Sequence, residues 1–420
     1  MKILIKKIEF LNFRSFSKVN IHFEEDLTVL IGINGSGKTT VTDGVAELLK
    51  YITEIIAYKK HEPEFYQKQD IKNGADNFEN TLHFDGELAG LTVNFGIFNR
   101  QSAFRFSDLD SDNLTENYFE ELHNEALSKQ TNLPLMVFYP CNFATIPPKY
   151  DEADISNNIF NIYENSFGSD AFDYPFFKKW LVWQYNLKKE TGESNFFDTA
   201  AQAITLILND TEDAVYDTMK ISYKNHPKGE IVLHKNGKEL TENQLSSGEK
   251  TLLMLTADLT RRLCIANPKL ENPLQGQGIV LIDEIDLHLH PRWQRKVIPK
   301  LRKTFPNIQF VITTHSPLVL ENVGPHNIRL LKDNEVIVPD FYPKGREIGE
   351  ILEELMEENA LSIQNEIDTY FELIAENKFN EAKKYKQDTL LQLTTEENPI
   401  FYQANAMIKR KKILANEAHK

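Results

Sequence analysis

The sequence predicts an α/β fold with a mixed sheet at its core. Continuous apolar runs of this kind are typical of central parallel strands that are covered on both faces. They lie at 27–31, 278–282 and 310–313. Alternating apolar residues at 80–98, broken by the turn signal Asp85-Gly86, indicate an antiparallel hairpin and hence an antiparallel β subdomain. Helical periodicity begins again at 348, which predicts a C-terminal helical tail.

The remaining elements follow in chain order. Strands are expected at 3–10, 19–23, 135–139, 219–223 and 231–234, and helices at 41–49 and 252–263. A further hairpin is expected around Asp333-Asn334. Composition then divides the chain into an N-terminal lobe (1–150), a helical insert (151–210), a C-terminal lobe (211–345) and an acidic helical tail (346–420). The tail is called acidic because 346–399 carries 14 acidic and 5 basic residues.

Composition excludes several classes of protein. The 420 residues are 41% hydrophobic and 26% charged, which is ordinary for a globular protein. The net charge of −15 argues against general coating of nucleic acid, but it leaves local basic patches open. No apolar run approaches the roughly 18 to 20 residues of a membrane span, so no membrane partner is expected. Two cysteines, Cys141 and Cys264, make no disulfide framework, and a cytoplasmic location is the simplest expectation.

The segment Gly-Ile-Asn-Gly-Ser-Gly-Lys-Thr at 32–39 fits the pattern G-x-x-x-x-G-K-[ST]. It stands between a predicted strand and a predicted helix, which is the context that a phosphate-binding loop needs. We therefore expect ATP as the ligand, with Lys38 neutralising the outer phosphates and the Thr39 hydroxyl on Mg²⁺. The alternative is a chance glycine turn. The candidate nucleotide-binding residues are Gly32, Ile33, Asn34, Gly35, Ser36, Gly37, Lys38, Thr39 and Thr40.

Two carboxylates, Asp283 and Glu284, close the apolar strand at 278–282. Such a pair is the second half of a nucleotide site: we assign Asp283 to the Mg²⁺ shell and Glu284 to the attacking water as a catalytic residue. A solvated acidic turn is the alternative interpretation. A zinc site built from these carboxylates with Asp286, His288 and His290 is a further one, but their spacing does not match known zinc ligand patterns.

Two more polar segments lie near predicted helix starts and strand ends. Leu245-Ser-Ser-Gly-Glu-Lys250 precedes the helix at 252–263, where Ser246 and Gly248 offer a hydroxyl and free N–H groups to an anion. His315, in Thr313-Thr-His-Ser-Pro317, follows a strand and is a second catalytic candidate. Taken singly, the first segment is a helix cap and the second a structural histidine.

Together and in this order, these four segments resemble the ABC-type ATPases of the SMC and RecF group. The resemblance implies an ABC/SMC-head-like P-loop NTPase in which two copies dimerise around two ATP molecules. It implies that Ser246 and Gly248 bind the γ-phosphate held by the opposite copy, and that His315 acts as a γ-phosphate switch in its own copy. Residues 285–291 would form the loop at the dimer seam. The family uses its histidines there without metal.

Two weaker correspondences complete the site. Asn12-Phe-Arg-Ser-Phe16 is similar to a family segment whose basic residue approaches the nucleotide, which makes Arg14 a candidate. Asn142 follows the strand that ends at Pro140 and stands where the family places a glutamine.

The segments at 258–268 and 278–294 are most similar to the PtuA-type ATPases of Septu anti-phage systems and of some retrons. That resemblance implies a homodimer or higher homo-oligomer and a separate HNH-type nuclease partner, and it leaves DNA or a retron RNA–DNA molecule open as a ligand. No nuclease is expected in this chain, because its Asp-x-Asp residues, Asp108-Leu-Asp110 with Asp112 behind them, lie in a polar loop-like stretch.

Two other functions stay open. A RecF-like DNA-repair ATPase would need a basic surface, for which the candidates are Lys59-Lys60, Lys178-Lys179 and Lys188-Lys189. An ATP-gated scaffold with no nuclease partner would use the acidic tail for docking.

Overall fold

The structure is a computed structural model, and its residues form two compact units, Met1–Arg346 and Glu347–Lys420. Among the described residues, no helix is both long enough and apolar enough to cross a bilayer. The described residues are 2–59, 68–88, 91–100, 104–108, 114–128, 131–141, 143, 158–167, 174–192, 196–209, 215–224, 226–339, 369–376, 378–390, 404, 407–408 and 411.

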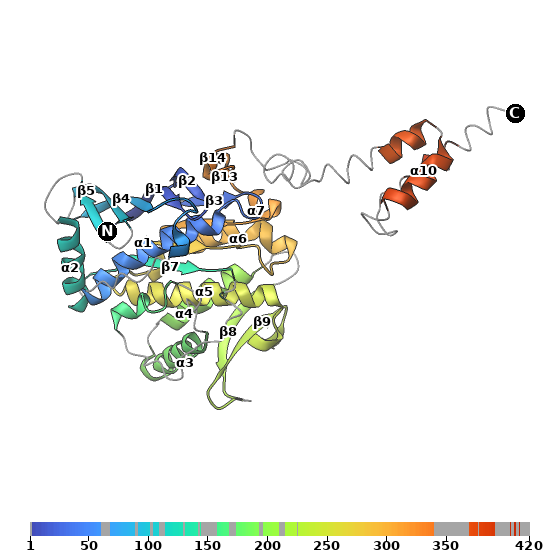
Figure 1. The fold of residues 1–420 in the computed structure, drawn as a ribbon. Helices are drawn as coiled ribbons and strands as arrows, with labels where there is room; N and C mark the ends of the chain where they lie inside the picture. Colours follow the sequence, from blue (N-terminus) through green and yellow to red (C-terminus); the bar gives the residue numbers. More distant parts are fainter. Residues whose placement is uncertain are drawn as a thin grey trace. The chain divides into compact units, whose positions relative to one another are not determined.

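A six-stranded sheet forms the centre of the first unit, in the order β14-β13-β3-β12-β11-β7 (Figure 1). All neighbours are parallel except the edge pair β13–β14. The strands are β3 (Leu27–Ile31), β7 (Leu135–Tyr139), β11 (Gly278–Ile282), β12 (Ile308–Thr313), β13 (Ile328–Lys332) and β14 (Glu335–Ile337). Every residue of β3, β7, β11 and β12 is buried, which explains why these strands read as continuous apolar runs.

A five-stranded antiparallel sheet, β2-β1-β4-β5-β6, is the second layer. Its strands are β1 (Ile3–Phe13), β2 (Phe16–His22), β4 (Glu79–Leu88), β5 (Leu91–Arg100) and β6 (Phe104–Asp108). The predicted turn at Asp85-Gly86 is wrong. Asp85 pairs with Leu4 and Gly86 pairs with Ile3, so β1 holds β4 extended past this dipeptide, and the reversal comes after Leu88.

Helices cover the central sheet. Helix α1 (Lys38–Tyr58) contacts β7, β11 and β12 and buries its apolar face in the same core as β1. The other helices of this unit are α2 (Leu114–Leu127), α3 (Tyr174–Thr191), α4 (Phe196–Leu208), α5 (Ser247–Ala266), α6 (Pro291–Thr304) and α7 (Pro317–Leu320). The predicted α/β fold, with a mixed sheet, antiparallel sheets and helices, is confirmed.

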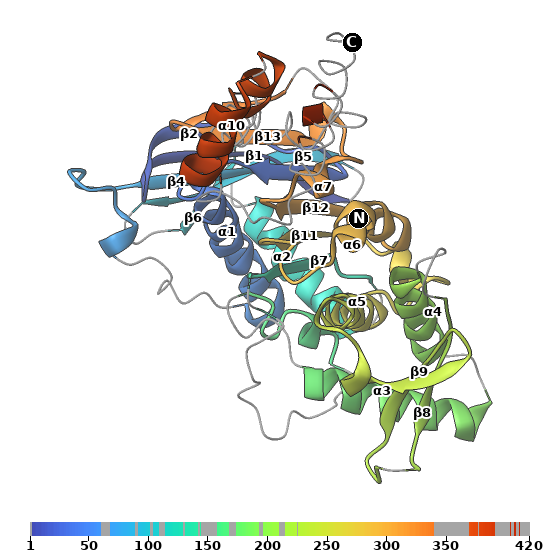
Figure 2. The same ribbon diagram turned by 90° about the vertical axis from the view of Figure 1, so that its right-hand side faces the viewer.

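A third, three-stranded antiparallel sheet lies beside α5, in the order β10-β9-β8. It comprises β8 (Tyr216–Ser222), β9 (Glu230–Lys235) and β10 (Lys238–Thr241). Figures 1 and 2 show β8, β9 and α3 on the side of α5 that faces away from β7. Helix α4 lies beside α5 and also contacts α6.

In the second unit, the described residues include helical positions 369–375 and α10 (Phe379–Tyr385). Tyr370 and Ile374 are buried together with Ala382 and Leu390, so the periodicity seen in the sequence points to a small core of its own. The first predicted helix of the tail, at 348–356, lies outside the described residues.

Candidate functional site

The glycine loop leaves the buried strand β3 and opens directly into α1. Gly32, Gly35 and Gly37 all have positive φ angles, of 147°, 82° and 101°. Gly37 caps α1, and a Cβ there would lie 2.4 Å from the ring of Phe16. Two features therefore require glycine at position 37: its left-handed backbone and the close approach of the β1–β2 hairpin.

Lys38 is buried, and its Nζ donates hydrogen bonds to two loop carbonyls, Gly32 O at 2.8 Å and Ile33 O at 3.0 Å. Burial lowers the pKa of this ammonium, while the charges of Asp283, Glu284 and Asp286 oppose the shift. The loop thus curls around its own lysine, whose charge faces the carboxylates that follow β11.

Asp283 meets the start of α1 although the two are far apart in sequence. The Thr39 hydroxyl lies 3.1 Å from Asp283 Oδ2, as the sequence assignment of both to one metal shell requires. The contact forms because β3, β12 and β11 are parallel neighbours whose carboxyl ends meet at one edge of the sheet.

Thr313, at the end of β12, organises the two carboxylates. Its fully buried hydroxyl donates to Asp283 Oδ1 at 2.5 Å and accepts the backbone N–H of Glu284 at 2.7 Å. Glu284 has a φ of 50°, a left-handed conformation that is uncommon for a residue with a side chain. The hydrogen bond to Thr313 therefore helps to hold Glu284 in a strained position.

His315 lies close to Glu284, with 4.0 Å between Nε2 and Oε1. Asp286 holds the loop that carries this histidine, because its Oδ1 accepts hydrogen bonds from the Thr314 hydroxyl and from the His315 N–H at 3.2 Å. The structure thus brings Lys38, Thr39, Asp283, Glu284 and His315 to one edge of the sheet.

Ser246 and Gly248 lie at the N-terminus of α5. Ser246 is the N-cap residue and forms a reciprocal capping box with Glu249. A Cβ on Gly248 would lie 2.9 Å from the carbonyl oxygen of His288, so the first turn of α5 packs against the backbone of the loop after Glu284. No hydrogen bond among the described residues joins Ser246 or Gly248 to the glycine loop.

A family described as "AAA domain, putative AbiEii toxin, Type IV TA system" matches residues 27–321, a range that contains the glycine loop, both carboxylates and His315. The chain belongs to this family of AAA-domain proteins.

Curated proteins are similar to this chain over most of its length. A protein named "Retron Vc95 probable ATPase" from Vibrio cholerae serotype O1 biovar El Tor is 28% identical over 417 residues, covering 84% of this chain and 78% of its own. The Septu protein PtuA of Bacillus thuringiensis is 23% identical over 420 residues, covering 93% and 94%. The resemblance to PtuA-type and retron ATPases is confirmed.

Solved structures with a more distant likeness include the SMC head domain from Thermotoga maritima, with a TM-score of 0.43 and 13% identity, over 81% of this chain and 100% of that one. The recombination mediator protein RecF has a TM-score of 0.38 and 13% identity, over 80% and 98%.

In this AAA-domain protein, the Arg14 side chain forms ion pairs with two aspartates. Its Nε donates to Asp70 at 2.8 Å and its guanidinium contacts Asp43 at 2.5 Å. Arg14 forms the tight β1–β2 turn next to the glycine loop, with a φ of 48°. Two carboxylates thus hold Arg14 beside the glycine loop, and its role at a nucleotide stays a prediction.

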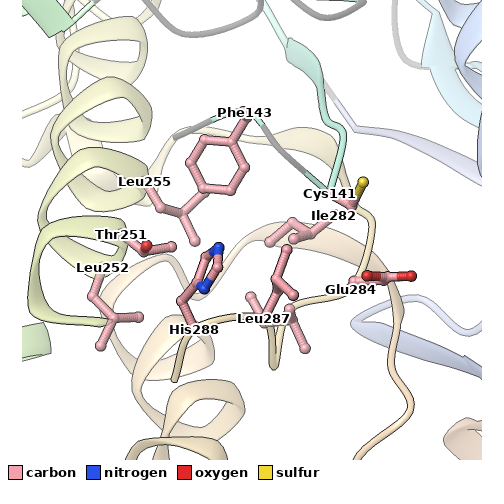
Figure 3. Close-up of a pocket in the computed structure, with 10 residues that line it drawn as sticks. Cys141, Phe143, Thr251, Leu252, Leu255, Ile282, Glu284, Leu287 and His288 are labelled. Carbon is pink, nitrogen blue, oxygen red and sulfur yellow. The ribbon is translucent and has the colours of Figure 1, made fainter. Parts of the chain in front are cut away.

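Asn142 lies outside the described residues, but both of its chain neighbours line a pocket beside Glu284. Figure 3 shows Cys141 close to Glu284, with Phe143 and His288 deeper in the pocket near α5. The segment thus approaches the carboxylate that is assigned to water. His290 instead caps α6, whereas His288 lines the pocket, so the two histidines of the alternative zinc site lie in different surroundings.

The residues present fit a phosphate chain and a divalent cation. The Ser36 Oγ is buried and has no hydrogen-bond partner among the described residues, so a hydroxyl in the loop is left for a ligand. Thr39 and Asp283 supply a hydroxyl and a carboxylate oxygen, the donors that Mg²⁺ prefers. When bound, Mg²⁺ would neutralise charge on the phosphates.

Sequence reasoning gave no role to Thr313 and considered Asp286 only as a zinc ligand, but both position the catalytic candidates. Thr313 stands two residues before His315 in the segment 313–317, but only the histidine was predicted to have a role. Its position at the end of a parallel strand adjacent to the strand of Asp283 is the signal that would have identified it.

Proposed function

We propose that this chain is an ATPase whose two copies close on ATP and that it controls a partner nuclease in anti-phage defence. One observation carries the catalytic part: at the carboxyl edge of the central sheet, Asp283 hydrogen-bonds Thr39 directly and is joined to Glu284 through Thr313. In this proposal Lys38 binds the outer phosphates, Thr39 and Asp283 hold the cation, and Glu284 positions and deprotonates water. Family membership and the names of the relatives support the same activity.

The dimeric part follows from the separation of the two halves of the site. Ser246 and Gly248 offer an N-cap hydroxyl and free helix N–H groups, yet they make no hydrogen bond to the glycine loop of their own chain. A helix N-terminus of this kind attracts a phosphate. We assign it to the phosphate held by a second copy.

Mixing two inactive variants tests the dimer. Lys38→Ala lacks a working glycine loop, and Ser246→Ala lacks the hydroxyl of Ser246, which we call the signature serine. A mixed pair nevertheless contains one intact site made from both chains. We expect little hydrolysis from either variant alone and measurable recovery on mixing. If mixed pairs form and no activity returns, the shared site is wrong.

The nuclease partner is proposed from the retron and Septu relatives. Co-expression with the product of the neighbouring gene, followed by DNA and RNA cleavage assays, tests it. Cleavage that requires the partner and changes in Lys38→Ala supports the proposal. Nuclease activity of this chain alone would contradict it.

The contacts of the candidate lysines give less support to a DNA clamp. Lys59 binds Asn124, Lys178 pairs with Glu242 and Lys188 pairs with Asp198, so one lysine of each pair is already held by a neighbour. Filter binding of duplex DNA over a range of salt concentrations separates the two functions, because a clamp shows a steep salt dependence.

A further inference from the structure

The Glu249 carboxylate joins the start of α5 to the three-stranded sheet. Its Oε2 accepts hydrogen bonds from the Ser246 N–H at 2.9 Å and from the Ser246 hydroxyl at 2.8 Å. Its Oε1 accepts from the Tyr216 hydroxyl at 2.7 Å and from the Lys235 ammonium at 2.6 Å. One buried side chain thus links the signature serine to β8 and β9 through four donors.

This arrangement decides what the Ser246 hydroxyl can do. Burial alone would raise the pKa of Glu249, but the hydrogen bonds from Lys235, Tyr216 and Ser246 outweigh it and lower the pKa to about 2. An ionised carboxylate only accepts hydrogen bonds, so the Ser246 hydroxyl must point its proton at Glu249. It cannot donate that proton to a phosphate at the same time.

The two donors from the sheet are themselves firmly placed. Tyr216 is buried, and its backbone N–H and carbonyl both bind the side-chain amide of Asn209, at 2.8 Å and 3.0 Å. Lys235 lies over the Tyr216 ring, with its Nζ 5.3 Å from the ring centroid. Both groups are therefore oriented before any ligand arrives.

If Ser246 turns its hydroxyl toward a phosphate, Glu249 keeps three of its four donors. Lys235 then neutralises the charge of a carboxylate that would otherwise face the phosphate as a like charge, and Tyr216 keeps a hydrogen bond to it. Without them, the free energy of turning Ser246 away from Glu249 rises, because a buried carboxylate is left short of donors.

We infer that Tyr216 and Lys235 are positioning residues for the signature serine. Acting through Glu249, they set how tightly the N-terminus of α5 engages the terminal phosphate of ATP bound by a second copy. The β8–β9 sheet is then a place from which the closure of the two copies is controlled. This inference rests on the proposed ATP-driven pairing of two copies.

The test measures self-association of the full chain by sedimentation velocity, with a non-hydrolysable ATP analogue and Mg²⁺. Nucleotide binding is measured separately with a fluorescent analogue at protein concentrations at which the chain is monomeric. We expect Tyr216→Phe and Lys235→Met each to weaken association by roughly tenfold, the scale of one hydrogen bond to a charged group, and to leave nucleotide binding unchanged.

Matched controls separate positioning from general stability. Lys220→Met removes a lysine of the same sheet that pairs with Glu239 instead, and we expect wild-type association. Lys235→Arg keeps a donor and should restore most of the association lost in Lys235→Met. Melting temperatures of all variants show whether the sheet is intact, and Tyr216→Phe provides a mild change if Lys235→Met unfolds.

The possible results are distinguishable. Wild-type association in Tyr216→Phe and Lys235→Met, with Ser246→Ala weakened, overturns this inference and leaves the proposed function standing. Failure of the wild type to associate with nucleotide overturns the proposed pairing and this inference together. Equal losses in Lys220→Met and Lys235→Met also overturn it, since the effect would then come from the sheet in general.

Discussion

The edge of the central sheet and the N-terminus of α5 are built in different ways. At the sheet edge, Thr39 hydrogen-bonds Asp283, and Thr313 hydrogen-bonds both Asp283 and the Glu284 N–H. The strands that lead into these segments, β3 and β11, are wholly buried. At α5, Ser246 is held by Glu249 and by the β8–β9 sheet, with no hydrogen bond to the sheet edge among the described residues.

The difference shows which half of the site is rigid and which can respond. Parallel strands fix the first half because any shift would break the packing of a close-packed core. The second half depends on a few polar contacts with a peripheral sheet, so a partner that displaces that sheet could change it at small cost. We therefore propose that the first half serves chemistry and the second control.

The largest effect should come from removing the positive charge of Lys38 from the glycine loop. Lys38→Ala is expected to weaken nucleotide binding by about 10²-fold or more, because the phosphates lose their charged donor. Equilibrium binding of a fluorescent ATP analogue measures this. Lys18→Ala, which changes an exposed lysine of β2, is the control and should bind normally.

Glu284→Gln should separate binding from hydrolysis. The amide keeps the shape of the side chain but cannot take a proton, so kcat is expected to fall by roughly 10²- to 10³-fold while nucleotide still binds. Steady-state phosphate release measures the rate, and sedimentation shows whether ATP-bound assemblies accumulate. Glu335→Gln on the exposed edge strand is the control. Unchanged turnover in Glu284→Gln would remove this residue from the mechanism.

Thr313→Val tests whether the sheet edge depends on its buried hydroxyl. Asp283 loses a donor and the Glu284 N–H loses its acceptor, a change that costs about 1 to 3 kcal/mol per buried group. We expect hydrolysis to fall about tenfold or more with a lower melting temperature. Thr304→Val, which removes a hydroxyl bonded within α6, should lower stability less and leave kcat alone.

The smallest effect concerns pH. Burial raises the pKa of Glu47, on α1, from 4.5 to about 7. Because the folded state holds this proton more tightly than the unfolded state, stability should decrease as the pH rises from about 4.5 through 7. Glu47→Gln should flatten that part of the curve in urea unfolding at several pH values. Glu120→Gln, on the exposed face of α2, is the matched control for the substitution itself.

Much of the first half was predictable because its signals are local. The glycine loop, Asp283, Glu284 and the buried strands that carry them each have a sequence signature, and the structure brings them together. The predicted turn at Asp85-Gly86 failed because pairing with β1 overrides a dipeptide preference. The sequence also did not reveal that two carboxylates bind Arg14, because those residues lie far from it in the chain.

The sequence by itself determined the chemistry: a phosphate loop between a strand and a helix, two carboxylates at the end of a buried strand, and a helix that begins with a serine cap. Each is encoded within a few neighbouring residues. Only the tertiary structure decided that Thr313 couples the carboxylates and that Tyr216 and Lys235 reach Ser246 through Glu249. Those contacts join residues 14 to 33 positions apart, and only the packing of the strands and of α5 brings them within hydrogen-bonding distance.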